Sequence, residues 1–328
     1  MGFEYVIARL KAMRGRFVDE AELESIAGGR DAQSTAMLLE RSLFGEGLKD
    51  WGRVTSAKLL AAVENGRLIA TQKAAALVRE NLPRHFGLIF SRQEMEQIKT
   101  AARRLRLAAP FLDDRPVLLE LSETPGWVGE WTKYRGVEGL KSALSRIRHP
   151  LADGVDPNLY GVKFELAMER FYFGVYLAER RGLAAEAWGY FADMNDMTNL
   201  HAARLADGRG TASIEDFFLA GPGRMGPKDF SMLCAASDAE FHARAGRLTG
   251  LKIIYRQGMA GFAQSLCGEL LVRWRVNAIV NPLGALEILV FLEELNAQAA
   301  NLKIAVNAGA EPGVDIEPRL YFSRRKAA

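Results

Sequence analysis

Residues 196–200 read Asp196-Met-Thr-Asn-Leu200, and the same polar–polar–aliphatic pattern occurs three times in this chain. The other two copies are Glu94-Met-Glu-Gln-Ile98 and Gln298-Ala-Ala-Asn-Leu302. The copies begin at residues 94, 196 and 298, so neighbouring copies are 102 residues apart. Equal spacing over long distances is typical of a chain built from related units, and here it predicts three units of about a hundred residues.

Each copy places an acidic or amide side chain three residues before an amide. This spacing puts both polar groups on the same face of a helix. Two roles are open for such pairs: holding the helix against a neighbouring segment, or binding a ligand. We favour the first role, because buried polar groups are usually hydrogen-bonded within the protein. The residues concerned are Glu94, Gln97, Asp196, Asn199, Gln298 and Asn301.

Helical patterns dominate the remaining sequence. Residues 56–81 are rich in Ala, Leu and Lys, which are good helix formers. After residue 160, large apolar residues recur every three or four positions, which indicates a helix with one buried face. We also expect a last long helix that Asn281 caps, with Pro282 in its first turn.

Strand signals are limited to two short, isolated stretches, 117–121 and 252–256. A parallel sheet would need several strands alternating with the helices. The sequence therefore predicts an all-α protein. The predicted organisation is three helical repeats, at residues 1–108, 109–210 and 211–328, that together form one compact unit.

The composition is that of an ordinary globular protein. Of the 328 residues, 49% are hydrophobic and 25% are charged, and the net charge of +3 is too small to indicate nucleic-acid binding. The two cysteines, Cys234 and Cys267, form no metal-binding or disulfide pattern. The start of the chain lacks the layout of a signal peptide. The longest apolar stretch, 283–292, includes Glu287 and is too short to span a membrane.

One stretch, Gly221-Pro-Gly-Arg-Met-Gly226, matches the GxGxxG pattern of dinucleotide sites. Such a site needs a strand before the glycines and a helix that opens within them. Pro222 and Pro227 surround the glycines, and no parallel-sheet pattern follows, so we read this stretch as a turn. We expect no cofactor. The four histidines (His85, His149, His201, His242) are scattered without metal-ligand spacing, and we expect no metal or catalytic role for them.

A basic run follows the first copy of the motif and includes Arg103, Arg104 and Arg106. Such a run is most often the solvated face of a helix. The alternative is a patch that meets an acidic partner. Both interpretations stay open at the level of sequence.

Several stretches together resemble the C subunit of archaeal and bacterial V/A-type ATPases, called subunit d in eukaryotes. They are Tyr5–Arg14, Met37–Gly45, Glu169–Phe173, Asp196–Leu200, Asp216–Leu219 and Asn281–Gly284. Their order and spacing follow the family from end to end. Three departures occur: Glu94 and Gln97 replace Asp and Asn, Gln298 replaces Asp, and Gly174 replaces an acidic residue. Residues 107–150 match poorly.

The resemblance implies an all-α, funnel-shaped protein of three subdomains around a pseudo-threefold axis. In this family the broad side rests on the cytoplasmic face of the rotating proteolipid ring, and the cavity receives the central stalk. The resemblance thus implies a peripheral, non-enzymatic coupling subunit without catalytic residues, whose partners are the stalk subunits and the ring. The alternatives are a free-standing α-helical repeat scaffold that binds other proteins and, less favoured, a nucleotide-dependent enzyme built on Gly221–Gly226.

Overall fold

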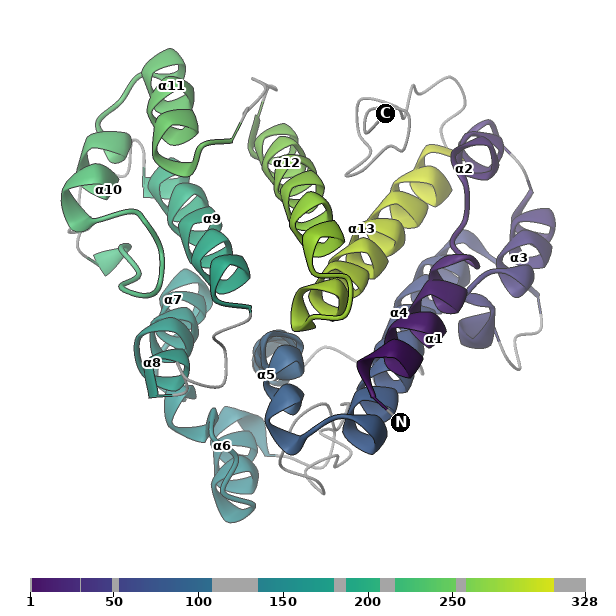
Figure 1. Ribbon diagram of the computed structural model, residues 1–328, viewed down its shortest axis with the longest axis horizontal. Coiled ribbons are helices and arrows are strands. Elements are labelled where there is room, and N and C mark those ends of the chain that lie inside the picture. The colour runs from purple at the N-terminus through teal and green to yellow at the C-terminus, as the bar shows by residue number, and fades with distance from the viewer. Residues whose placement is uncertain are drawn as a thin grey trace. The chain divides into compact units, whose positions relative to one another are not determined.

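A computed structural model describes residues 2–29, 31–48, 53–107, 135–179, 187–206, 216–251 and 258–309, without the side chains of 107 and 258–260. Every regular element in these ranges is helical, which confirms the predicted fold class (Figure 1). The strand candidates 117–121 and 252–256 lie outside the described residues, as do the predicted repeat boundaries at 108/109 and 210/211. The division into three repeats, and their funnel-shaped arrangement, therefore stay predictions.

The helices, in chain order, are α1 (Phe3–Arg14), α2 (Glu20–Ala27), α3 (Ala32–Arg41), α4 (Ser56–Asn81), α5 (Ser91–Leu107), α6 (Gly136–Arg146), α7 (Gly161–Phe171), α8 (Leu177–Glu179), α9 (Trp188–Ala206), α10 (Pro227–Cys234), α11 (Asp238–Thr249), α12 (Gly258–Val280) and α13 (Ala285–Gly309). A π-helical stretch, Tyr172–Tyr176, joins α7 to α8. None of the described helices combines the length and the apolar character that crossing a bilayer requires.

The order of the elements repeats along the chain. Each copy of the motif lies on a helix, α5, α9 or α13, and a long helical element precedes each of them. These preceding elements are α4, the α7–α8 segment with its π-helical stretch, and α12. Shorter helices lie between the pairs, with α6 after α5 and α10–α11 after α9. This order of the described helices is consistent with the predicted repeats, which stay a prediction.

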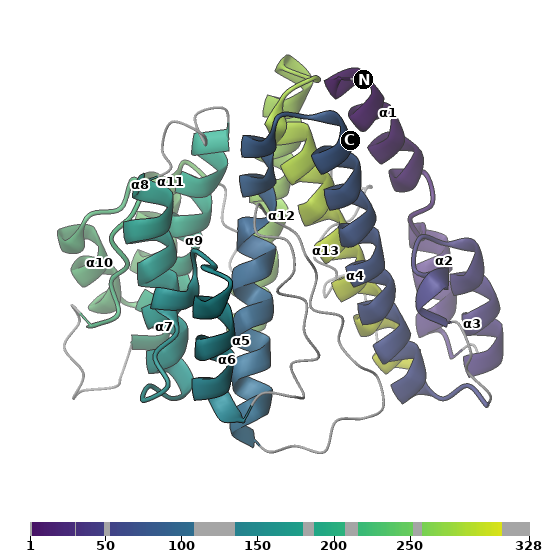
Figure 2. The same ribbon diagram turned by 90° about the horizontal axis from the view of Figure 1, so that it is seen from below.

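The chain divides into two compact units, Met1–Arg84 with Leu270–Ala328, and His85–Glu269. In the first, called unit 1, α13 packs against α1, α2 and α4 (Figures 1 and 2). Leu289, Phe291 and Leu302 of α13 are buried, and Phe291 stacks on Phe17 with 6.1 Å between the ring centroids. The last described helix therefore builds the core on which the first helices of the chain pack.

In the second unit, called unit 2, α9 packs on α10 and α11, while α5 packs on α6 and α7. Its core is rich in aromatic side chains. Tyr172 and Phe173 of the π-helical stretch are buried and meet edge to face, with 5.1 Å between their centroids. The Tyr172 hydroxyl lies 3.0 Å from the hydroxyl of Ser91, at the start of α5, and so joins the two helices.

The start of the last helix was predicted wrongly. Residues 281–284 form a turn, in which the Gly284 N–H donates to the Asn281 carbonyl at 3.1 Å, and α13 begins at Ala285. Asn281 and Pro282 therefore lie in the turn that connects α12 to α13, and they do not begin the last helix. By contrast, the predicted helix 56–81 coincides with α4.

Candidate functional site

The second copy of the motif fastens a loop to α9. Asn199 is completely buried; its Oδ1 accepts the N–H of Leu219 at 2.8 Å, and its Nδ2 donates to the Leu219 carbonyl at 3.0 Å. The Asp196 carboxylate accepts the N–H groups of Arg224 at 2.9 Å and Met225 at 3.0 Å. The burial and bonding expected for this pair are thus confirmed, and the pair holds the segment 216–226 that leads into α10.

The glycines of Gly221–Gly226 allow this loop to approach α9. A Cβ at Gly223 would lie 2.3 Å from Asp196 Oδ1, and one at Gly221 would lie 2.8 Å from the Cβ of Phe173. The described residues before these glycines, 216–220, include no strand, so the context of a dinucleotide site is missing there. Two N–H groups of the loop already bind the motif carboxylate. The packing of the loop against its neighbours accounts for the first two glycines of the pattern, Gly221 and Gly223.

One arginine balances the charge of the carboxylates on α9. Burial raises the pKa of Asp196, although the N–H groups of Arg224 and Met225 act in the opposite direction. The Arg224 guanidinium lies 2.6 Å from Asp193 Oδ1 and 3.4 Å from Asp196 Oδ2, while its side chain stays about half exposed. Arg224 therefore closes the site on its solvent side.

The first copy uses a histidine in a comparable position. Glu94 is buried on α5, and its Oε2 lies 3.6 Å from Nε2 of His149, which is also buried. Nδ1 of His149 accepts the N–H of Leu151 at 3.2 Å. His149 thus lies between the motif helix and the segment after α6, whereas Gln97 is half-buried. The sequence did not predict this histidine, because nothing in its spacing connects it to Glu94.

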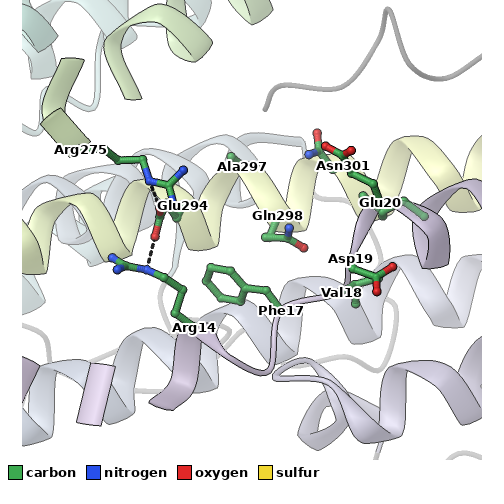
Figure 3. Close-up of a pocket in the computed structure, with 11 residues that line it drawn as sticks. Arg14, Phe17, Val18, Asp19, Glu20, Arg275, Glu294, Ala297, Gln298 and Asn301 are labelled. Atoms are coloured by element: carbon green, nitrogen blue, oxygen red, sulfur yellow. Dashed lines mark ion pairs between the residues drawn. The ribbon is translucent and has the colours of Figure 1, made fainter. Parts of the chain in front are cut away.

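The third copy lines a small pocket within unit 1, shown in Figure 3. Gln298 and Asn301 of α13 face the segment around Phe17 and Asp19, which leads into α2. The cavity volume of about 30 Å³ suffices for water molecules but not for a nucleotide. Asp19 is engaged as the N-cap of α2, where it accepts the Glu22 N–H at 2.8 Å. This copy therefore also lies against a segment that leads into a short helix.

A buried ionic cluster lies beside the third copy. Glu294 lies between Arg14 and Arg275 (Figure 3), with 2.7 Å between its Oε1 and the Nε of Arg275. Arg14 also pairs with Glu287 at 2.9 Å. Burial raises the pKa of Glu294, and the two arginines counteract this effect only in part. The cluster joins α1 to α12 and α13 inside unit 1.

The basic run of α5 faces acidic residues of α7. Lys99 is buried and lies 2.9 Å from Glu169 Oε1, while Arg92 lies 2.6 Å from Glu169 Oε2. Arg103 binds Glu165 at 2.6 Å. Burial opposes the charge of Lys99, but Glu169 and Glu96 outweigh this effect, so the pKa of Lys99 is raised.

Two of the three arginines proposed as a partner patch therefore have contacts inside unit 2. Besides the pair of Arg103 with Glu165, the guanidinium of Arg106 lies 4.2 Å from the ring centroid of Phe164 and donates to the Asp156 carbonyl at 3.3 Å. Arg104 is half-buried and also has an interaction within the chain. Glu165 and Glu169, which form ion pairs with the basic side chains of α5, were not predicted as their partners.

The described contacts of the motif are made with polypeptide. In the second copy they are hydrogen bonds to backbone groups, and in the first they run through a histidine side chain. Among the residues that the structure describes, no three His, Cys, Asp or Glu side chains gather as a metal site. No protein-family model matches this chain, and no curated protein matches it either.

Proposed function

We propose that this chain is a non-catalytic coupling subunit of a rotary V/A-type ATPase. It would lie on the cytoplasmic face of the membrane and link the central stalk to the proteolipid ring. Ion transport driven by ATP, or the reverse reaction, would then depend on it as a mechanical connection. The sequence resemblance that runs from Tyr5 to the turn at Asn281–Gly284 is the origin of this proposal.

The observation that carries the proposal is that one arrangement of helices and motif residues recurs along the chain. A long helical element precedes each motif helix, and described polar residues of each copy lie against a segment that connects to another helix of the same unit. The resemblance implies three related helical subdomains, and this recurrence is consistent with them. It also gives the motif a structural role, as expected for a family without catalytic residues of its own.

The ionic clusters support a mechanical role by a separate argument. Lys99, Arg92 and Glu169 join α5 to α7, and Arg14, Glu287 and Glu294 join α1 to α13. Removing one member of a buried ion pair costs about 3–5 kcal/mol, so such pairs resist separation of the helices. A subunit that transmits torque needs helices that do not slide past one another.

Co-purification tests the proposal directly. The tagged chain, expressed with the stalk subunits and the proteolipid subunit of its own cell, is expected to retain both after detergent extraction. A chain that retains neither, yet captures unrelated soluble proteins through its helices, would favour the free-standing scaffold. Coupling is then measured in reconstituted vesicles as ion movement per ATP hydrolysed, with and without the chain.

A further inference from the structure

The hairpin between α12 and α13 exposes a row of aliphatic side chains. Ile279 and Val280 are 76% and 84% exposed, although both are large and apolar. The residues of this exposed apolar tip are Val272, Val276, Ile279, Val280 and Leu283. Positions 272, 276 and 280 are four residues apart, so they follow one face of the helix, and Leu283 continues the row into the turn.

The tip is not required for the core of unit 1. Leu271, Trp274 and Ala278, on the other face of the same helix, are buried and supply the packing. No charged residue occurs between Val276 and Leu286, although charged residues make up 25% of the chain. Contiguous apolar surface of this kind marks an interaction site on a soluble protein.

The chemistry of the tip limits what can cover it. An anionic lipid surface attracts clusters of Lys and Arg and favours interfacial aromatic side chains. The five side chains of the tip include neither. Of the two arginines beside them, Arg275 is bound to Glu294 at 2.7 Å, and Arg273 is half-buried and also has an interaction within the chain. A second copy of the chain would need about 20–30 residues a side for a stable interface, and the tip offers five side chains.

The remaining occupant is an uncharged apolar protein surface that belongs to an assembly held together by further contacts. Contacts elsewhere on the chain add to the binding energy of the tip, so a patch too small to form a stable interface by itself can still contribute to affinity. We propose that the exposed apolar tip docks on the cytoplasmic end of the proteolipid ring. This inference rests on the proposed function, and it assigns the ring contact to the α12–α13 hairpin.

The test measures how one variant binds to two partners, the ring and the stalk. The full-length chain carrying Ile279→Lys and Val280→Lys is passed over immobilised, detergent-solubilised proteolipid ring and, separately, over stalk subunits. Because two buried, unpaired charges would oppose docking, we expect at least a tenfold loss of affinity for the ring and no change for the stalk. The control carries Met37→Lys and Met232→Lys, which add the same charge at exposed apolar positions, and it should bind like the parent. Equal melting temperatures of both variants exclude unfolding, since all four side chains are exposed.

Several results would overturn the assignment. They are unchanged binding of the tip variant to the ring, an equal loss on ring and stalk, and a loss shared by the control. Flotation of the parent with phosphatidylcholine–phosphatidylserine vesicles that the tip variant abolishes would assign the tip to lipid. A parent dimer in sedimentation velocity that the variant dissolves would assign it to a second copy. If the parent binds neither ring nor stalk, the proposed function fails as well, which separates that failure from failure of the tip alone.

Discussion

Asn199 uses both groups of its amide on a single residue, Leu219, and this arrangement makes it hard to replace. We predict that Asn199→Ala lowers the free energy of unfolding by about 1–3 kcal/mol, because the Leu219 backbone groups would stay buried without partners. A urea melt measures the change. Asn277→Ala, at an exposed position of α12, serves as the control and should change stability little. If the Asn199 variant melts like the parent but no longer couples ATP hydrolysis to ion movement, the residue acts at an interface instead.

The packing of the loop 216–226 against α9 also depends on Gly223. A methyl group there would lie 2.3 Å from Asp196 Oδ1, so Gly223→Ala must displace the loop or the carboxylate. We predict a loss of about 1–3 kcal/mol, which is typical of overpacking. A Cβ at Gly189, on the same helix as Asp196, meets no atom within 4 Å. Gly189→Ala should therefore leave the melting temperature unchanged or raise it slightly, and an equal loss in both variants would contradict the role assigned to the loop.

The same geometry predicts that the loop does not bind nucleotides. The Arg224 and Met225 N–H groups that a phosphate would need are already bonded to Asp196, whose ionised form would also repel an anion. Calorimetric titration of the chain with ATP, ADP and NAD should show no heat of specific binding. Micromolar affinity that Gly223→Ala abolishes would refute this prediction.

At the scale of elements, Glu169 joins α7 to α5 by accepting both Arg92 and Lys99. We predict that Glu169→Gln lowers the free energy of unfolding by about 1–3 kcal/mol, because Arg92 and Lys99 would lose their most buried acceptor and keep the more exposed Glu96. Arg103→Gln is the matched control. Its side chain is 49% exposed and Glu165 keeps Lys99 at 3.1 Å, so the cost should be under about 1 kcal/mol. Similar melts for the two variants would mean that the cluster adds no stability beyond that of a surface pair.

Helices could be predicted from the sequence where a segment has strong helix formers, a cap or one buried face. The segment 56–81 was predicted well, because its residues are strong helix formers and Thr55 caps it by accepting the Lys58 N–H. By contrast, α12 was not predicted. Apolar residues lie on several of its faces, including the exposed apolar tip, so no single buried face sets a period. The uncharged turn 281–284 then looked like the start of a helix.

Only part of the candidate site could be predicted from the sequence. The motif residues were predicted from their interval, and the burial of Asp196 and Asn199 follows from the apolar residues around them. Their partners could not be predicted, because Leu219 contributes only backbone groups and the position of His149 depends on how the chain folds back. The basic run was visible, but its acidic partners lie on another helix, and Arg103 and Glu165 are 62 positions apart in the sequence.

At the scale of the whole molecule, unit 1 is assembled from both ends of the described chain. Arg14 and Glu287, which pair at 2.9 Å, are 273 residues apart in sequence. Arg14 also pairs with Glu294, whose side chain is only 5% exposed. The interaction between α1 and α13 therefore depends on a cation that is itself mostly buried, and no local element can replace it.

We predict that Arg14→Met loosens unit 1 as a whole. Glu287 would lose its cation, and Glu294 would keep only Arg275, at a cost of about 3–5 kcal/mol for a broken buried pair. Amide hydrogen exchange, followed by mass spectrometry, should show faster exchange in α1, α2 and α13, because local opening precedes global unfolding. Lys73→Met removes an ion pair with Glu46 in the same unit, but the Lys73 side chain is 51% exposed, so exchange should change little. Faster exchange confined to α1 would show instead that this helix is a dispensable extension, and that the core of unit 1 is complete without the chain's first residues.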